Sequence, residues 1–435
     1  MRIVSKMALA IALGGMAVAA PAFAKKEQKQ EKPADKASPA VQKASFDAQK
    51  AADAGDIPTA LTNYAAAKAA MTTDDDKFMV GRVGYQIYQK NKDMALFAEA
   101  VDLMLASGKS SPDAQKQLYF AQGQIAYNSK DFAKAAVAFK NAETAGSADP
   151  DLVPLLVEST AQSGQTLQAI NVLNEEVAKR QAAGQPVPAE WYQRGLAIGY
   201  KAKPNPAEAA AVNSATLELA KKWVAAEPQP RNWNAALEIY SQQYKLGNDD
   251  RTEVLRFLRA AGALQGDADY REYALNVYLR FPNEALQVLQ EGSSKGIVNV
   301  TKGDAADVMG IVKGKVGADK ASLPAADKSA RSAATGKAAL STADAYVGYA
   351  DYAKAIDLYK IALAKGGVDA ATVNLHMGWA QALSGDAAGA KTSFAAVTGA
   401  KKPLADFWVI HLDHPTVANA APAAAPAAPP APPAK

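Results

Sequence analysis

The sequence predicts an all-α protein built from short helices that pack in antiparallel pairs. Between Val41 and His414, apolar residues recur three and four positions apart in stretches of about 12 to 18 residues, interrupted by clusters of Gly, Pro, Asn or Asp. This spacing is typical of amphipathic helices, whereas the alternation of β-branched residues typical of strands is hard to find. A motif of small and bulky residues also repeats along the chain. Short helices, short connections and a repeated motif together favour a repeat architecture.

The repeated motif places a small residue four positions before a bulky apolar residue, often with an alanine three positions further on. The interval from Ala135 to Ala169 is 34 residues, and the interval from Ala355 to Ala390 is 35. Because two short helices approach closely only where facing positions lack bulk, we expect the small residues to lie between paired helices. Gly123 and Gly378, upstream of two copies, are expected to play the same part. The copies are Ala60-Tyr64-Ala67, Ala135-Phe139-Ala142, Ala355-Tyr359-Ala362, Ala390-Phe394 and, more loosely, Ala169-Leu173.

These residues resemble the tetratricopeptide repeat (TPR), whose pattern runs W-x2-L-G-x2-Y and then A-x3-F with a period of 34 residues. The segment 119–150 is the best single copy. Trp191 and Gly195 match the first half of the pattern, which Arg194 and Ile198 break. The resemblance implies a right-handed α-solenoid whose concave face takes up a peptide or another protein.

The resemblance is clear over residues 41–70, 76–183 and 336–398. The turns at 128–132 and 349–352 look like the polar, Asp, aromatic corner between the two helices of a TPR. The layout as a whole is similar to secreted alanine-rich TPR proteins of alphaproteobacteria. That group brings no established reaction or cofactor with it.

The ends of the chain predict export. Arg2 and Lys6 precede an uncharged apolar run, and an Ala-Phe-Ala box at 22–24 comes before Lys25, as in a secretory signal peptide cleaved after Ala24. An uncleaved anchor is the alternative, but the apolar run is shorter than the roughly 20 residues of a spanning helix. We therefore expect a periplasmic protein, with a charged disordered linker at 25–40 and an Ala/Pro-rich tail at 415–435 that is a spacer, a docking segment or an extension of no specific role.

The region between these ends is expected to fall into three parts. Residues 41–291 form an N-terminal TPR-like solenoid, and residues 336–414 form C-terminal TPR-like repeats with a cap. Glycines dilute the helical pattern of 292–335, which predicts degenerate helices or a hinge. The cap is a single closing helix at 402–414 that lays its apolar residues across the last pair, because a solenoid end needs covering.

Composition leaves few parts for catalysis. The 435 residues include no cysteine and three histidines, and the net charge is +4. Disulfides, thiolate nucleophiles and cysteine-ligated metals are excluded, and so balanced a charge argues against non-specific nucleic-acid binding. No phosphate-binding glycine loop or serine-nucleophile elbow occurs. We expect no catalytic residue, no cofactor and no metal.

Two groups of residues raise a metal site as an alternative. His411, Asp413 and His414 lie within one helical turn, but a fourth ligand is missing, which favours a solvated helix C-terminus. His376 is expected to be ordinary packing or groove lining. The run at 74–76 is three aspartates before a helix expected to begin near Lys77, and it predicts helix capping rather than a calcium loop, whose alternating ligands and central glycine are absent.

A peptide-binding groove is expected along the first helices of successive pairs. Tyrosines and amides there would offer broad apolar contact together with hydrogen bonds to an extended backbone. The alternative is that several of the tyrosines pack between helices with only the hydroxyl at the surface. The candidate residues are Tyr85, Tyr88, Gln124, Tyr127, Asn128, Tyr192, Tyr200, Asn234 and Glu238.

Three functions remain open from the sequence. The first is a non-enzymatic periplasmic scaffold or adaptor that binds protein or peptide partners in envelope assembly, export or secretion. The second is a wall- or envelope-associated structural protein, suggested by the Ala/Pro tail and the charged linker. The third is an envelope enzyme with a site near the C-terminus, for which only the cluster at His411 speaks. The sequence does not identify the partner, the pathway or the oligomeric state.

Overall fold

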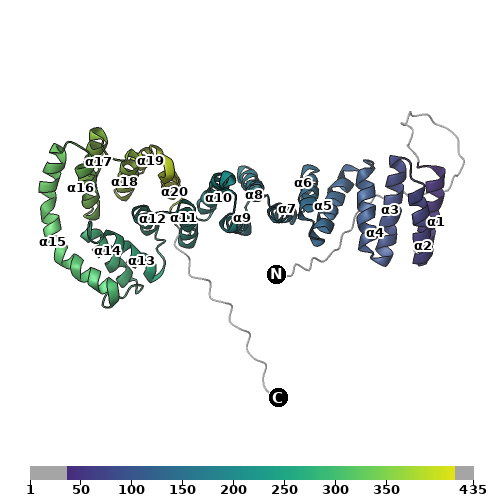
Figure 1. The fold of residues 1–435 in the computed structure, drawn as a ribbon, viewed down its shortest axis with the longest axis horizontal. Helices are drawn as coiled ribbons and strands as arrows, with labels where there is room; N and C mark the ends of the chain where they lie inside the picture. Colours follow the sequence, from purple (N-terminus) through teal and green to yellow (C-terminus); the bar gives the residue numbers. More distant parts are fainter. Residues whose placement is uncertain (1–36, 417–435) are drawn as a thin grey trace, which may run out of the picture. The chain divides into compact units, whose positions relative to one another are not determined.

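The computed structural model describes residues 37–416, which contain 20 α-helices, one short 3₁₀ helix and no strand (Figure 1). The all-α prediction is confirmed. The predicted signal peptide, most of the linker and residues 417–435 of the predicted tail lie outside the described residues. No helix within residues 37–416 is both long enough and apolar enough to cross a membrane.

The chain divides into two compact units at Lys179 and Arg180, and each is described by itself. The first unit consists of four consecutive helix pairs, with extensive packing between the two helices of each of the first three pairs. Its helices are α1 (Pro39–Asp53), α2 (Ile57–Ala69), α3 (Asp74–Asn91), α4 (Met94–Ala106), α5 (Pro112–Asn128), α6 (Phe132–Thr144), α7 (Leu152–Gln162) and α8 (Thr166–Ala182).

The repeated motif lies between paired helices, as predicted. Ala135 and Phe139 of α6 are fully buried, and a Cβ placed on Gly123 of α5 would lie 2.5 Å from the Phe139 ring. Gly378 stands in the same relation to Phe394, at 2.6 Å. Glycine is required at both positions because the bulky ring of the second helix sits against the backbone of the first.

Aspartates begin many of the second helices. At the two predicted corners, Asp131 accepts a hydrogen bond from the backbone N–H of Lys134, and Asp351 accepts one from Lys354. The residue before each aspartate, Lys130 or Ala350, has a positive φ that closes the turn.

The aspartate run at 74–76 also caps a helix, as expected, although α3 begins at Asp74 rather than near Lys77. Thr73 and Asp76 form a capping box, in which each side chain bonds the other residue's backbone N–H. The buried Asp76 carboxylate also accepts hydrogen bonds from the backbone N–H groups of Thr72 and Ser38. Burial would raise the pKa of Asp76, but these backbone donors outweigh it and lower that pKa.

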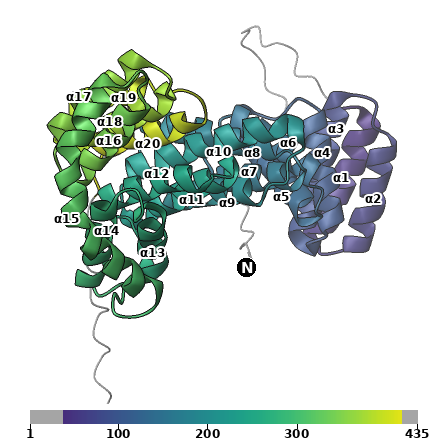
Figure 2. The same cartoon turned by 60° about the vertical axis from the view of Figure 1, so that its left-hand side comes forward.

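The second unit holds the remaining helices. They are α9 (Ala189–Lys201), α10 (Pro206–Ala226), α11 (Pro230–Tyr244), α12 (Asn248–Ala260), α13 (Gly266–Val277), α14 (Pro282–Ser294), α15 (Gly303–Ser332), α16 (Lys337–Gly348), α17 (Tyr352–Lys365), α18 (Ala370–Leu383), α19 (Ala387–Ala395), the 3₁₀ helix η1 (Gly399–Lys401) and α20 (Lys402–Asp413). Figure 2 shows α15 along one edge of this unit, joining α14 to α16.

The helices of the second unit turn back on themselves, so that α20 packs on α10 and α11 as well as on α19 (Figure 1). Phe407 of α20 lies edge-on to Trp233 of α11, with ring centroids 6.4 Å apart. The Tyr240 hydroxyl donates a hydrogen bond to the carbonyl of Ala400 at 3.0 Å. The predicted closing helix is present, and it joins the end of the unit to its beginning rather than covering only the last pair.

The segment 292–335 differs from the expected degenerate helices or hinge. Residues 303–332 form the single helix α15, which contains Pro324 and four of the diluting glycines. A Cβ placed on Gly310, Gly314 or Gly317 would meet nothing within 4 Å, so these glycines lie on an open face and do not interrupt the helix. The division at Lys179 and Arg180 also differs from the expected boundary at 291, because α20 ties the last repeats to α10 and α11.

Candidate functional site

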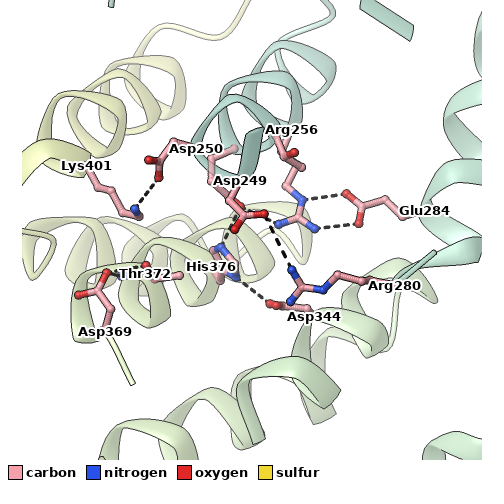
Figure 3. Close-up of polar contacts among 12 residues, drawn as sticks. Asp249, Asp250, Arg256, Arg280, Glu284, Asp344, Asp369, Thr372, His376 and Lys401 are labelled. Atoms are coloured by element: carbon pink, nitrogen blue, oxygen red, sulfur yellow. Dashed lines mark hydrogen bonds and ion pairs between the residues drawn. The ribbon is translucent and has the colours of Figure 1, made fainter. Parts of the chain in front are cut away.

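Buried charges occupy the interior of the second unit (Figure 3). Glu253 and Arg256 come from α12, Glu284 from α14, Asp344 from α16 and His376 from α18. We call these five residues the ionic cluster. Arg256 is only 4% exposed and Glu284 only 2%, and the other three side chains are also buried. Charged side chains are almost never this deeply buried unless they are paired.

Arg256 is the centre of the ionic cluster. Its Nε and Nη2 donate to the two carboxylate oxygens of Glu284 at 2.8 and 2.9 Å, and its Nη1 donates to Glu253 Oε1 at 2.8 Å. The guanidinium also lies 4.4 Å from the ring centroid of Trp379. This bidentate and stacked geometry is specific to arginine, since a lysine ammonium cannot reproduce it.

His376 links two carboxylates on different helices. Its Nδ1 lies 2.7 Å from Asp344 Oδ1, and its Nε2 forms an ion pair with Glu253 Oε1 at 3.0 Å. Two buried tyrosines complete the network. The Tyr359 hydroxyl donates to Asp344 Oδ1 and the Tyr273 hydroxyl donates to Glu284 Oε1, both at 2.7 Å.

The pairing decides the charge states inside the unit. Burial alone would lower the pKa of His376, but the carboxylates of Asp344 and Glu253 outweigh it and raise that pKa to about 10. Burial would raise the pKa of Glu253, and here His376 and Arg256 outweigh it and hold that pKa at about 2. His376 is therefore protonated and Glu253 ionised at neutral pH.

A cavity lies on each side of the ionic cluster. The larger, of about 510 Å³, is lined by early residues of three helices, among them Glu253 of α12, Asp344 of α16 and His376 of α18. The smaller, of about 250 Å³, is lined by later residues of the same helices and by α14. Arg256 lines both cavities. The three helices thus run in the same direction past the cluster, and the cluster separates the two cavities.

Three of the predicted groove residues meet on another face of the second unit. Tyr200 at the end of α9 is 57% exposed, and its hydroxyl accepts a hydrogen bond from Gln242 Nε2 at 3.3 Å. Gln242 also donates to Glu238 at 3.0 Å, one turn earlier on α11. Asn234 lies one turn before Glu238 and reaches Asp269 of α13 at 3.4 Å. We call Tyr200, Asn234, Glu238 and Gln242 the α9–α11 face.

Of the other predicted groove residues, Asn128 alone is exposed. Tyr85 and Tyr192 are 4% and 1% exposed, so their rings pack between helices, which was the alternative for these tyrosines. Tyr88 is half-buried and stacks on Phe97, with ring centroids 4.4 Å apart. These rings are buried because close helix pairs need bulky side chains as filling.

On α5, Gln124 and Tyr127 are half-buried and Asn128 is exposed. The Tyr127 ring lies edge-on to Phe132 of the next helix, with centroids 5.5 Å apart. This stretch keeps polar atoms at the surface of the first unit, whereas Tyr200 belongs to the second.

The residues that raised a metal site are accounted for by packing. His411 lies among Trp233, Phe257 and Trp408, and burial lowers its pKa. Its ring is therefore half-buried against these aromatic residues rather than fully solvated. Asp413 pairs with a lysine of α19 instead of with a histidine. Within residues 37–416, no group of three His, Asp or Glu side chains is arranged to hold a metal ion.

Sequence reasoning missed four members of the ionic cluster and assigned His376 to packing or groove lining. One local signal existed. Glu253 and Arg256 fall among Thr252, Val254, Leu255, Phe257 and Leu258, a stretch with no exposed face. Charges within a helix that is buried all round imply partners elsewhere in the chain.

Comparisons with known proteins leave the family open. No family model matches the chain, and no curated protein matches it. Among solved structures, "Structure of Naa15/Naa10 bound to HypK-THB" matches at 15% identity and a TM-score of 0.27, covering 83% of this chain and 58% of that chain. This chain thus spans just over half the length of that neighbour. "Crystal structure of APC/C hetero-tetramer Cut9-Hcn1" matches at 12% identity and a TM-score of 0.18, covering 85% and 82%. Likenesses this distant carry no argument about function, so the TPR-like helical repeat fold rests on the helix pairs described above.

Proposed function

We propose that this protein is a non-enzymatic periplasmic scaffold that binds protein or peptide partners in cell-envelope assembly, export or secretion. The observation that carries the proposal is the α9–α11 face, where an exposed tyrosine, two amides and a carboxylate lie together on consecutive first helices. Such a mixture of aromatic area and hydrogen-bonding groups suits an extended polypeptide. The periplasmic location is supported by the leader pattern of residues 1–24.

The state of the ionic cluster supports a binding role over a catalytic one. A general base near neutral pH needs a pKa close to the working pH and a free lone pair. His376 has a pKa of about 10 and both ring nitrogens face carboxylates, so it stays protonated. Arg256 and Glu284 are bound to each other in bidentate geometry. These groups hold helices together and are not poised for proton transfer.

The test is site-specific photo-crosslinking in envelope preparations, with the crosslinker placed at Gln242. We expect discrete crosslinked partners with the wild-type chain and their loss in the triple variant Tyr200→Ala, Asn234→Ala, Glu238→Ala. A matched triple variant on the exposed face of α15 should keep them, since these residues lie on another helix; it is Asp307→Ala, Lys313→Ala, Lys315→Ala. Absence of any crosslinked partner, or equal yields from both triple variants, would refute the proposed role.

A further inference from the structure

Charges of both signs line the larger cavity, and they nearly cancel. Glu284, which lies outside this cavity, offsets Arg256 through its bidentate pair. Net charge therefore selects neither a cation nor an anion, and the groups that lack partners decide which ligand fits. The cations of the lining are Arg256, Arg280, Lys337, His376 and Lys401, and its anions are Asp249, Asp250, Glu253 and Asp344.

Cationic groups without close partners lie where α12 and α16 begin. Lys337 is the first residue of α16, is exposed and has no ion-pair partner among the described residues. Arg280 makes no hydrogen bond within residues 37–416, and its one ion pair is a contact of 4.0 Å with the exposed Asp249 at the start of α12 (Figure 3). No side chain caps α16, and its first turn holds no acidic residue, so its N-terminus adds positive potential. This end of the cavity favours a negatively charged group.

The neighbouring acidic residues limit the charge of that group. Asp249 and Asp250 belong to the first turn of α12 and line the same cavity. Asp250 is engaged by Lys401 at 2.6 Å, whereas Asp249 is offset only by the distant Arg280. A carboxylate with a single charge is repelled less here than a phosphate with two.

Deeper in the cavity, two carboxylates each keep one free oxygen. Glu253 Oε1 contacts Arg256 and His376, while its Oε2 has no hydrogen-bond partner within residues 37–416. Asp344 Oδ1 contacts His376 and Tyr359, while its Oδ2 has no partner in the same part of the chain. Both residues line the cavity. Since net charge does not select a cation, neutral hydroxyl groups suit these acceptors, and a hydroxyl bonded to a carboxylate makes a strong hydrogen bond.

One unmet donor also lines the cavity. Asn276 Nδ2 is buried and has no hydrogen-bond partner, although an unmet buried donor costs about 1–3 kcal/mol. A hydroxyl both donates and accepts, so a ligand with several hydroxyls can serve this amide as well as the carboxylates. Asp344 follows Lys337 by seven residues on α16, about 10 Å further along the helix, so the hydroxyls and the negative charge belong to separate ends of one ligand.

We propose that this cavity binds a sugar ring that carries a carboxylate, of which a hexuronic acid is the simplest example. The carboxylate lies with Lys337 and Arg280 at the start of α16, and the ring hydroxyls donate to Glu253 and Asp344. Val277, Leu340 and Phe281 supply an apolar wall for the C–H groups of the ring. The volume of about 510 Å³ falls within the range of about 300–1,000 Å³ found for ligand sites. The cavity shares no residue with the α9–α11 face, so this inference goes beyond the proposed function and does not depend on it.

The probe is D-glucuronate, and two controls each remove one of its features. Glucose keeps the hydroxyls and lacks the charge, whereas cyclohexanecarboxylate keeps the ring and the charge and lacks the hydroxyls. Isothermal titration calorimetry with the processed full chain at low salt should give a dissociation constant below about 1 mM for glucuronate and binding at least about tenfold weaker for both controls. Glucose 6-phosphate should bind more weakly than glucuronate because of the aspartates at the start of α12.

Two variants outside the ionic cluster test the assignment of the residues. Lys337→Gln should weaken glucuronate binding severalfold and make the affinity less sensitive to salt. Asn276→Ala should also weaken binding severalfold without loss of stability, because the amide donor it removes is unmet in the free protein. Lys313→Gln, an exposed lysine of α15 outside the cavity, is the matched control and should bind like the wild type.

Four results would overturn the inference. They are no glucuronate binding up to about 1 mM, equal binding of either control compound, tighter binding of glucose 6-phosphate, and wild-type affinity in both Lys337→Gln and Asn276→Ala. Crosslinked partners on the α9–α11 face alongside any of these results would leave the scaffold role standing and remove only the sugar site.

Discussion

Replacement of Arg256 by methionine tests the ionic cluster most directly. The substitution keeps much of the side-chain volume but removes three hydrogen bonds, two to Glu284 and one to Glu253, and leaves both carboxylates buried. Among the described residues, Glu284 then keeps only the hydrogen bond from the Tyr273 hydroxyl. Removing one partner of a buried ion pair costs about 3–5 kcal/mol, because the remaining charge is neither solvated nor paired. We expect Arg256→Met to lower the free energy of unfolding by that amount, a large fraction of the roughly 5–15 kcal/mol of a domain.

The cost should come from the uncompensated charge rather than from lost packing. In the double variant Arg256→Met with Glu284→Gln, the glutamine removes the orphan charge and its oxygen still accepts from Tyr273. We therefore expect the double variant to recover about half or more of the stability lost in Arg256→Met. Additive losses would refute this reasoning.

Urea unfolding followed by tryptophan fluorescence suits the measurement, since all five tryptophans lie between residues 191 and 408, in the second unit. The first unit does not contribute to the signal. Arg331→Met is the matched control. Arg331 also makes two ion pairs, with Asp327 and Asp357, but at the surface, where such pairs contribute little. The unfolding midpoint of Arg331→Met should stay close to that of the wild type. If Arg331→Met and Arg256→Met lost the same stability, burial of the ionic cluster would carry no special weight.

Three further predictions use the same chain. The raised pKa of His376 gives stability that is complete below pH 6.5 and is lost as pH rises toward about 10, by at most roughly 5 kcal/mol. The free energy of unfolding measured by tryptophan fluorescence should therefore fall between these pH values, and His376→Gln should make that fall smaller. Gly123→Ala should destabilise the first unit by about 1–3 kcal/mol in thermal unfolding followed by circular dichroism, because its Cβ would meet Phe139. Gly310→Ala, on the open face of α15, should be neutral or stabilise by up to about 1 kcal/mol. Equal effects of the two substitutions would contradict the close contact between Gly123 and Phe139. The lowered pKa of Asp76 gives stability that is present above about pH 4 and decreases progressively below it, so Asp76→Asn should be less stable than wild type at pH 7 and the difference should narrow between pH 4 and pH 2 by circular dichroism.

The helix pairs could be predicted from the sequence because their determinants are local. Gly123 and Phe139 meet within one hairpin, and the aspartate at 131 caps a helix that begins at the next residue. Periodicity, capping and close packing all act over a few turns, so a single sequence displays them. The same local signals misjudged α15, because glycine weakens a helix only modestly and nothing nearby forces a turn.

The ionic cluster could not be predicted in the same way. Glu253 and His376 are far apart in sequence and become neighbours only because the second unit turns back on itself. That closure depends on non-local contacts such as those of Trp233 with Phe407. The groove prediction failed at Tyr85 and Tyr192 for a related reason, since a repeat pattern identifies the helix but not how much of each face its neighbours cover.

Closure changes what the interior of the second unit can be. An open solenoid exposes its inner helices to solvent or to a ligand, whereas here α12, α14, α16 and α18 surround charges that are paired with one another. Apolar filling would hold the same helices together as strongly or more strongly, but it would accept many registers. An arginine bidentate to one carboxylate and a histidine held between two others accept few. The ionic cluster therefore fixes the positions of these helices relative to one another rather than adding net stability. With the helices held in this way, the cluster separates two cavities, where an open solenoid would have one continuous groove.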